Sequence, residues 1–315
     1  MKIRIINYFL VYLIFFPILI FFSYNDFAAK SYFSLQFHST IEAIGGSAAL
    51  FLAYLLHRQA GQRPRQYTPW VLSGLIGMGM LDLFHSMAPP GERFIWLHSS
   101  ATLVGGLFFA LVWLSGKVRQ IRTVSLLPQI ILFLSVLTGM SALFFKSTVP
   151  PMLSGDDFTI IAEGLNILGG TFFVAAAAWF LNTYRQDRKR FDAALFANFC
   201  LLLGLAGMVF PLSRLWDVEW WIWHIIRLFA YSLVFLYVSE VVLHAEENLV
   251  ESEARFRTLF DQAAVGVAQI ESRTGKFIQI NRKYCDIIGY PPEEIKEMLF
   301  QQHSLRVFYS VVKEY

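Results

Sequence analysis

Histidine and acidic side chains recur at the ends of apolar segments within residues 1–243. Glu42 follows His38 by four positions, and His85 follows Asp82 by three. Residues three or four apart share one face of a helix, so each pair can act together. Imidazole with carboxylate suits a divalent transition metal, whereas imidazoles alone suit a b-type haem. The candidate site residues are His38, Glu42, Asp82, His85, His98, Glu163, His224 and Arg227.

Three interpretations of this group are open. The side chains hydrogen-bond between helices or lie hydrated among headgroups, they line a pocket for a polar small molecule or ion, or they hold metal or haem. A CxxCH motif is absent from the sequence, which excludes covalent c-type haem. The candidate metal or haem ligands are His38, His85, His98 and His224.

Ionisable groups at membrane depth are costly and usually face the interior of a helix bundle. Arg227 lies one turn below His224 and needs a carboxylate partner, which Glu42, Asp82 or Glu163 can supply. Nearby tryptophans are interpreted as an aromatic belt that anchors the outer membrane face: Trp96, Trp216, Trp220, Trp221 and Trp223. We expect His38, Glu42, Asp82, His85, His98 and His224 to converge on one pocket near that face.

The composition of the chain indicates that the candidate site residues lie on membrane-spanning helices. The 315 residues are 56% hydrophobic and 16% charged, with a mean hydropathy of +0.50, and the apolar excess lies in residues 1–243. A helix needs roughly 20 mainly apolar residues to cross the hydrocarbon core. The sequence predicts an all-α polytopic membrane bundle of eight transmembrane helices, the first an uncleaved anchor, at residues 5–22, 37–57, 70–87, 94–115, 123–145, 159–182, 192–212 and 220–243.

Basic residues between these segments predict the orientation of the bundle. Alternate loops on one side hold twelve Lys and Arg: Lys2, Arg4, Arg58, Arg63, Arg65, Lys117, Arg119, Arg122, Arg185, Arg188, Lys189 and Arg190. The other side holds four: Lys30, Arg93, Lys146 and Arg214. The positive-inside rule therefore places both termini in the cytoplasm. We expect a multi-pass protein of the bacterial inner membrane.

Pairs of glycines recur in the even-numbered segments. A pair follows His38 and His98 by seven residues, and a third pair occupies the same offset from Ala162. This spacing indicates four related helical hairpins, or a chance similarity among apolar segments. Small residues let helices approach closely in lipid, so packing is the expected role of Gly45, Gly46, Gly105, Gly106, Gly169 and Gly170.

The segment after His244 has an ordinary soluble composition. Leu249, Phe256, Leu259 and Phe260 recur at about helical spacing among charged residues, which predicts a signalling helix that pairs with a second copy of the chain. Short strands follow at 265–270 and 277–280, separated by a Thr274-Gly275 turn. Next, Asn281 caps a helix that ends at Gly289, and Gly289-Tyr290-Pro291 precedes Glu293-Glu294.

This order of an Arg-Phe helix, Gly266, the turn, Asn281 and Gly289-Tyr290-Pro291 resembles the start of a PAS domain over residues 252–298. In the membrane part, Phe37-His38 with Glu42, and Leu81-Asp82-Leu83-Phe84-His85, resemble the third class of membrane-associated sensor domains. The resemblance implies an integral-membrane sensory bundle ahead of PAS, histidine-kinase or diguanylate-cyclase modules.

The expected domains are a membrane sensor at 1–243, a signalling-helix linker at 244–257, and the N-terminal part of an α+β PAS domain at 258–315. We expect that PAS portion to be incomplete and unable to fold stably alone, because a two-stranded ribbon is marginal in water.

The sequence thus predicts a sensory input module, which passes a stimulus through the eighth helix to the PAS domain and on to a histidine kinase or, next in preference, a diguanylate cyclase. No kinase or cyclase motif is present in the chain, so it is expected not to be an enzyme itself. The alternatives are a small-molecule or ion transporter and a metal- or haem-dependent membrane enzyme. The expected partners are the lipid bilayer, a second copy and an unidentified small molecule or ion. A net charge of +3 argues against nucleic acid.

Overall fold

The computed structural model describes residues 31–60, 65–116, 125–145, 149–297 and 300. The chain divides into two compact units, Met1–Ser239 and Glu240–Tyr315. The predicted first span at 5–22 lies outside the described residues, as does nearly all of 298–315.

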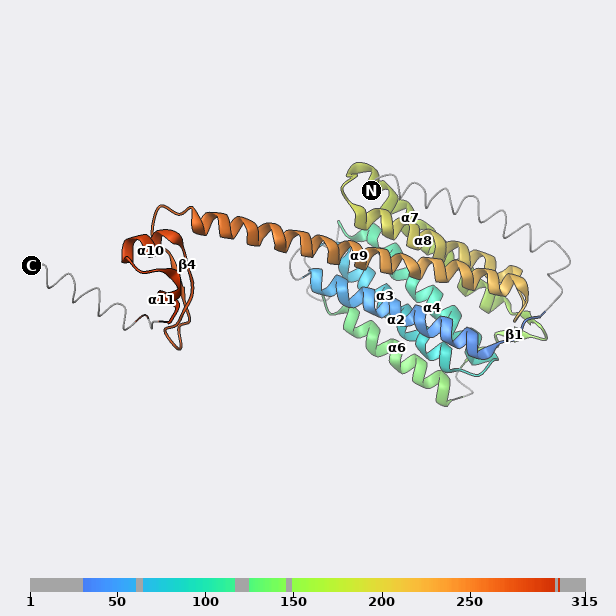
Figure 1. Cartoon of the computed structure of the whole chain (residues 1–315). Coiled ribbons are helices and arrows are strands. Elements are labelled where there is room, and N and C mark those ends of the chain that lie inside the picture. The colour runs from blue at the N-terminus through green and yellow to red at the C-terminus, as the bar shows by residue number, and fades with distance from the viewer. Residues whose placement is uncertain (1–30, 61–64, 117–124, 146–148, 298–299, 301–315) are drawn as a thin grey trace, which may run out of the picture. The chain divides into compact units, whose positions relative to one another are not determined.

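The first unit is a bundle of long apolar helices (Figure 1). Six are long and apolar enough to cross a membrane. They are α2 (Leu35–Ala60), α3 (Thr68–Met87), α4 (Glu92–Ala110) with the 3-10 turn η1 (Leu111–Leu114), α6 (Leu127–Phe144), α7 (Ile160–Gln186), and α8 (Phe191–Val209) with η3 (Phe210–Leu212). These six correspond to the second to seventh predicted segments, and the predicted count of eight is not established by them.

The predicted eighth segment is part of a longer helix, α9 (Val218–Asp261). Asp217 begins it, because its carboxylate accepts hydrogen bonds from the amides of Arg214 and Trp220, both at 2.6 Å. The helix has no break at residue 243. The boundary predicted there therefore falls inside one continuous element, and the contacts within each unit place the division at Ser239–Glu240.

Neighbouring helices follow the chain closely. α3 packs against α2, α4 and α6, and α7 packs against α4 and α8. Before α7, the short strands β1 (Leu153–Ser154) and β2 (Asp157–Phe158) pair in an antiparallel hairpin that the sequence did not predict. The Thr159 hydroxyl then caps α7 by accepting from the amide of Ala162.

The glycines that were assigned to packing lie where helices meet. A Cβ atom on Gly169 would come within 2.6 Å of the Thr102 carbonyl on α4, and one on Gly170 within 2.8 Å of the Gly204 carbonyl on α8. Gly106 faces the backbone of Gly169 in the same way. Only residues without a side chain permit this approach of α4, α7 and α8.

The partners of the other glycines are mixed. Gly46 meets the backbone of Gly79 on α3, where an added Cβ would lie 2.8 Å from its carbonyl oxygen. Gly45 instead faces the ring of Tyr231, and Gly105 faces Phe173 and Met78. Glycine at these positions leaves room for a large side chain from the neighbouring helix.

The second unit contains a small antiparallel sheet and two short helices. Strand β3 (Ala268–Ile270) pairs with β4 (Phe277–Ile280), with Ala268 opposite Ile280 and a bulge after Gln269. Helices α10 (Arg282–Ile288) and α11 (Pro292–Glu297) follow. The strand predicted at 277–280 is confirmed, and the one predicted at 265–270 is shorter, since it begins at Ala268. The predicted turn and helix end are confirmed, since Gly275 and Gly289 have φ of +73° and +79°, values that favour glycine.

Asn281 organises this unit. Its side chain is fully buried and accepts from the amides of Val267 and Tyr284, at 2.9 and 2.8 Å. Its amide donates to the carbonyls of Phe260 and Val265, at 2.9 and 3.0 Å. The predicted cap of α10 thus also fixes the end of α9 and the residues before β3.

Candidate functional site

Four helices bring the predicted polar residues together. We call this group the polar cluster, and its members are all buried: His38 and Glu42 on α2, Asp82 and His85 on α3, His98 on α4, and His224, Arg227 and Tyr231 on α9. The i, i+3 and i, i+4 spacings identified in the sequence aim each helix's polar side chains at a common centre. Tyr231 was missed, although it follows Arg227 by one helical turn.

Arg227 connects α9 to the other three helices. One of its Nη atoms donates to Asp82 at 2.6 Å and lies 3.4 Å from the Glu42 carboxylate. The other Nη lies 2.6 Å from Nδ1 of His98. Tyr231 donates its hydroxyl to the same Asp82 oxygen at 3.0 Å. Asp82 is therefore the main partner of Arg227.

Two histidines have a fixed orientation because a backbone carbonyl accepts from each ring. Nδ1 of His85 lies 2.7 Å from the Phe94 carbonyl, and Nδ1 of His224 lies 2.7 Å from the Trp220 carbonyl. A carbonyl only accepts, so both Nδ1 atoms carry hydrogen. In the neutral imidazole, Nε2 is then left with a lone pair that points into the polar cluster.

The Nε2 atoms face His38 and Glu42. Nε2 of His85 lies 3.3 Å from Nε2 of His38, and Nε2 of His224 lies 3.4 Å from Oε1 of Glu42. Among the described residues, Nδ1 of His38, Oε2 of Glu42, Oδ1 of Asp82 and Nε2 of His224 are buried without a hydrogen-bond partner. Unpaired buried polar atoms are costly, so the polar cluster is incompletely satisfied by the protein's own groups.

Aromatic rings enclose the polar cluster. Trp223 stacks on His224 with ring centroids 3.6 Å apart, Trp220 lies 3.8 Å from the same ring, and Phe94 lies 4.2 Å from His85. Trp216, Trp220 and Trp223 are buried. The prediction that these three residues form an interfacial belt was wrong, because their side chains are buried in the bundle. Trp220 and Trp223 lie beside His224 on α9 and pack on its ring. Trp96 and Trp221 are partly exposed.

Glu163 is not part of the polar cluster. It lies in the first turn of α7 and is only partly buried. Asn166, one turn further along, is the polar residue that α7 buries, and its amide donates to the Ser99 hydroxyl of α4 at 2.8 Å. The prediction failed because matching depth along a helix does not fix which face the side chain occupies.

A second polar group joins the starts of α3 and α8. The Tyr67 hydroxyl donates to Asp192, which also pairs with Arg190 at 2.9 Å and with Arg65 at 3.7 Å. Burial raises the pKa of the Tyr67 hydroxyl, and the neighbouring Asp192 carboxylate raises it further. Tyr67 therefore remains a hydrogen-bond donor at neutral pH. The sequence did not predict this group, because Tyr67 and Asp192 lie 125 residues apart.

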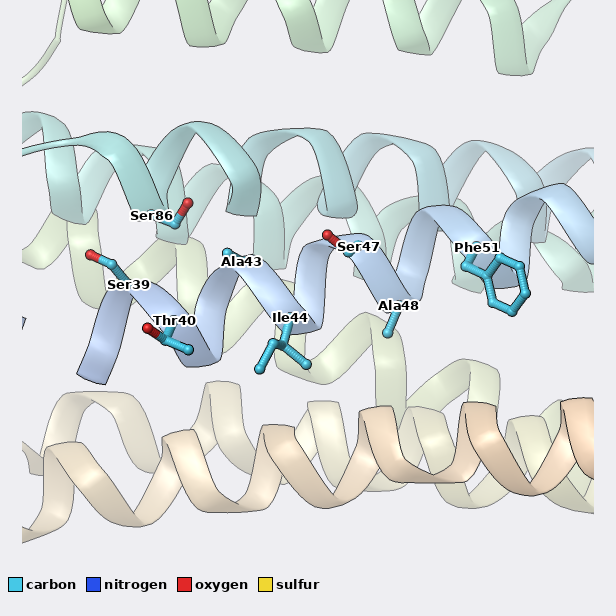
Figure 2. A pocket seen from close by; sticks show the side chains of 8 residues that line it. All are labelled: Ser39, Thr40, Ala43, Ile44, Ser47, Ala48, Phe51 and Ser86. Atoms are coloured by element: carbon cyan, nitrogen blue, oxygen red, sulfur yellow. The ribbon is translucent and has the colours of Figure 1, made fainter. Parts of the chain in front are cut away.

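Two hollows in the described residues lie at or near the polar cluster. A cavity of about 10 Å³, the size of one water, lies beside His98 and Arg227. An open groove of about 680 Å³ runs along α2, with one residue from α3 (Figure 2). Its lining has no charged group: Ser39, Thr40, Ala43, Ile44, Ser47, Ala48, Phe51 and Ser86. The small cavity thus has room for about one water beside His98 and Arg227 of the polar cluster.

Comparison with known proteins found similarities to the second unit. A family model described as a PAS domain matches residues 254–312. A curated protein of Escherichia coli (strain K12), named "Probable diguanylate cyclase DgcE", is 34% identical over 56 residues. Those residues are 18% of this chain and only 5% of that protein. No solved structure matches the chain. Residues 254–312 are therefore similar to a PAS domain, and the helices described in the first unit include six that are long and apolar enough to span a membrane.

Proposed function

We propose that residues 1–243 form a membrane-embedded sensory module that controls a cytoplasmic PAS domain through α9. The observation that carries this proposal is the continuity of α9 from Val218 to Asp261. The helix supplies His224 and Arg227 to the polar cluster at its start. At its end, Phe260 accepts a hydrogen bond from Asn281 of the PAS unit.

The distribution of polar contacts supports this route. Glu42, Asp82 and His98 each contact a side chain of α9, so a change in any of the three alters the contacts that hold the helix. Packed helices respond to such changes by small shifts between discrete arrangements. A stimulus at the polar cluster then reaches the PAS domain as a translation or rotation of α9.

The proposed orientation follows from the basic loops, with both termini in the cytoplasm of a bacterium and the polar cluster near the outer face. The output is a histidine kinase or a diguanylate cyclase to which the PAS domain relays the signal. The similarity to a probable diguanylate cyclase supports a signalling role, but its 56 residues do not decide between these outputs.

A second copy of the chain is the proposed partner of α9. Leu249 and Phe256 lie seven residues apart on this helix and are 69% and 50% exposed. A seven-residue spacing of apolar side chains is the pattern of a two-stranded coiled coil. Cysteines introduced at these positions, in a chain lacking Cys200 and Cys285, should form an intermolecular disulfide at position 249 or 256 and not at the charged position Glu253.

Insertions into α9 test the proposed function. The full chain is extended at its C-terminus with a diguanylate cyclase catalytic domain, and cyclic di-GMP is measured in cells. Two alanines inserted between Glu247 and Asn248 rotate the following helix by about 200°, whereas seven residues rotate it by nearly two full turns. We expect the two-residue insertion to change output several-fold and the seven-residue insertion to preserve it. Equal output from both insertions would refute transmission through α9.

A further inference from the structure

The centre of the polar cluster has the donor set of a metal site. His38, Glu42 and His224 each offer one ligand atom, and the three atoms lie within 4.8 Å of one another. The same relation holds for Glu42, His85 and His98. All of these side chains are buried and come from helices α2, α3, α4 and α9.

We propose that His38, Glu42, His85 and His224 bind one divalent transition-metal ion. Imidazole and carboxylate ligands together suit zinc and its neighbours in the first transition row. This inference rests on the proposed sensory function and names the class of ion that its site recognises.

Distances within the site fit a four-coordinate ion. With ligand bonds of about 2.0–2.1 Å, a tetrahedral centre places neighbouring ligand atoms about 3.3–3.4 Å apart. The His85–His38 pair of Nε2 atoms is 3.3 Å apart, and the His224–Glu42 pair is 3.4 Å apart. The ligand atoms of His38, Glu42 and His224 lie within 4.8 Å of one another, so a small inward movement of these side chains closes them on one ion. His85 joins this set through His38, 3.3 Å away, and through Glu42, with which it shares the second group of ligand atoms.

The second layer of contacts is also typical of a metal site. A metal-ligating histidine generally donates its other ring N–H to a carbonyl or carboxylate, which fixes the ring and its tautomer. His85 and His224 do this with the carbonyls of Phe94 and Trp220. Their Nε2 atoms therefore present lone pairs to the polar cluster, and Nε2 of His224 is buried without a hydrogen-bond partner.

The balance of charge favours a cation. Glu42 and Asp82 are buried beside a single guanidinium, and Arg227 lies closer to Asp82 than to Glu42, at 2.6 and 3.4 Å. A buried carboxylate without full compensation is unfavourable. A divalent ion ligated by Glu42 gives this carboxylate a direct cationic partner and changes the net charge of the group from −1 to +1.

His98 is excluded from the ligand set by Arg227. The guanidinium lies 2.6 Å from its Nδ1 and 3.4 Å from its Nε2, which places a positive charge against the ring. Phe94 lies 4.2 Å from the His85 ring and Trp223 stacks 3.6 Å from the His224 ring, so a single ion suits these enclosed histidines better than the large ring of a haem.

Metal binding is measured on the full chain in lipid nanodiscs. The protein is stripped with chelator, dialysed against buffered zinc chloride, and analysed for zinc by mass spectrometry. We expect roughly one zinc ion per chain, as in four-ligand protein sites. In His38→Ala, Glu42→Gln and His224→Ala, affinity should fall by more than the roughly 10–100-fold that loss of a second-layer partner costs.

Two control variants match these substitutions. His57→Ala removes an exposed histidine from the same helix as His38, and Glu163→Gln removes a carboxylate that lies outside the polar cluster. Both should bind zinc like the wild type. Equal loss in the controls and the site variants would overturn the assignment of ligands.

A measurement on the wild type alone guards against variants that fail to fold. Trp220 and Trp223 contact the His224 ring, so Cu²⁺ bound there should quench tryptophan emission at one equivalent, and Zn²⁺ added first should prevent the quenching. No saturable quenching, together with no bound zinc, would overturn the proposed metal site.

Combining zinc with the α9 insertion assay separates the two proposals. Zinc binding that alters cyclic di-GMP output supports both. If zinc binds and output stays constant, the metal site stands and sensing through the polar cluster fails. If zinc does not bind and the two- and seven-residue insertions into α9 still give different output, the metal site is wrong and the proposed function stands.

Discussion

Asp82 and Arg227 lie 145 residues apart in sequence and form a buried ion pair at 2.6 Å between α3 and α9. Tyr231 donates to the same carboxylate oxygen, and Glu42 lies 3.4 Å from the guanidinium. Arg227 therefore holds the start of α9 against both α3 and α2.

Replacing Arg227 by alanine should strongly destabilise the bundle. The change leaves Asp82 and Glu42 buried without a cation, and breaking a buried pair costs about 3–5 kcal/mol. Thermal unfolding in nanodiscs measures the effect. Arg214→Ala is the matched control, since its 2.7 Å pair with Asp157 is about two-thirds exposed and should contribute no more than about 1 kcal/mol.

A double variant tests the reason for that loss. Asp82→Asn with Arg227→Met removes both charges, so the Asp82 site no longer carries an unpaired ion. We expect the double variant to unfold at a higher temperature than Arg227→Met alone. Additive losses would mean that the two residues act independently.

Glycine at position 169 should be far more sensitive than glycine at 164 on the same helix. In Gly169→Ala, the new Cβ meets the Thr102 carbonyl at 2.6 Å, and overpacking of this kind costs about 1–3 kcal/mol. In Gly164→Ala, nothing lies within 4 Å, so the change should be neutral or stabilise α7 by up to about 1 kcal/mol. Unfolding of the two variants side by side provides the comparison.

The polar residues of α7 provide a third prediction. Asn166→Ala should destabilise the α4–α7 contact by about 1 kcal/mol, because the Ser99 hydroxyl loses its partner across the helices. Glu163→Gln should leave stability unchanged within error, since the residue is only partly buried. A larger effect at position 163 would show that the carboxylate does contribute to the packed core.

Asn281 should be the most sensitive polar position of the PAS unit. Asn281→Ala removes four hydrogen bonds and leaves buried backbone groups unpaired, at a cost of about 2–4 kcal/mol. Hydrogen–deuterium exchange of the full chain should show faster exchange at the end of α9 and through β3. Lys283→Ala, an exposed change in α10, should leave both segments protected.

Much of the fold follows from local patterns. Six predicted apolar segments correspond to described helices, and in the PAS unit the Thr274-Gly275 turn and the Asn281 cap are confirmed. The hairpin β1–β2 escaped prediction because its strands have two residues each, too short for an alternating pattern. Composition changes near residue 243 while the helix continues to Asp261, as expected of a signalling helix that runs out of the eighth segment.

Predicting the site required two things for each side chain, its position along the helix and the helix face that it occupies. Spacing correctly indicated that His38 with Glu42, and Asp82 with His85, share helix faces, and the structure brings these pairs together. Rotation of a helix about its axis cannot be inferred from depth, which is why Glu163 was included and Asn166 omitted. A tryptophan at the end of an apolar helix can anchor the helix among headgroups or pack inside the bundle. Only the tertiary structure reveals that Trp220 and Trp223 pack on His224.

The glycine contacts of α7 divide the bundle into a fixed part and a movable part. At Gly169 and Gly170, backbone meets backbone on α4 and α8, so no side chain can change rotamer to absorb a displacement. Sliding there would bring main-chain atoms into collision, and α4, α7 and α8 must behave as one block. A rearrangement at the polar cluster would then displace α2, α3 and α9 relative to the block of α4, α7 and α8, while the helices of that block keep their positions relative to one another.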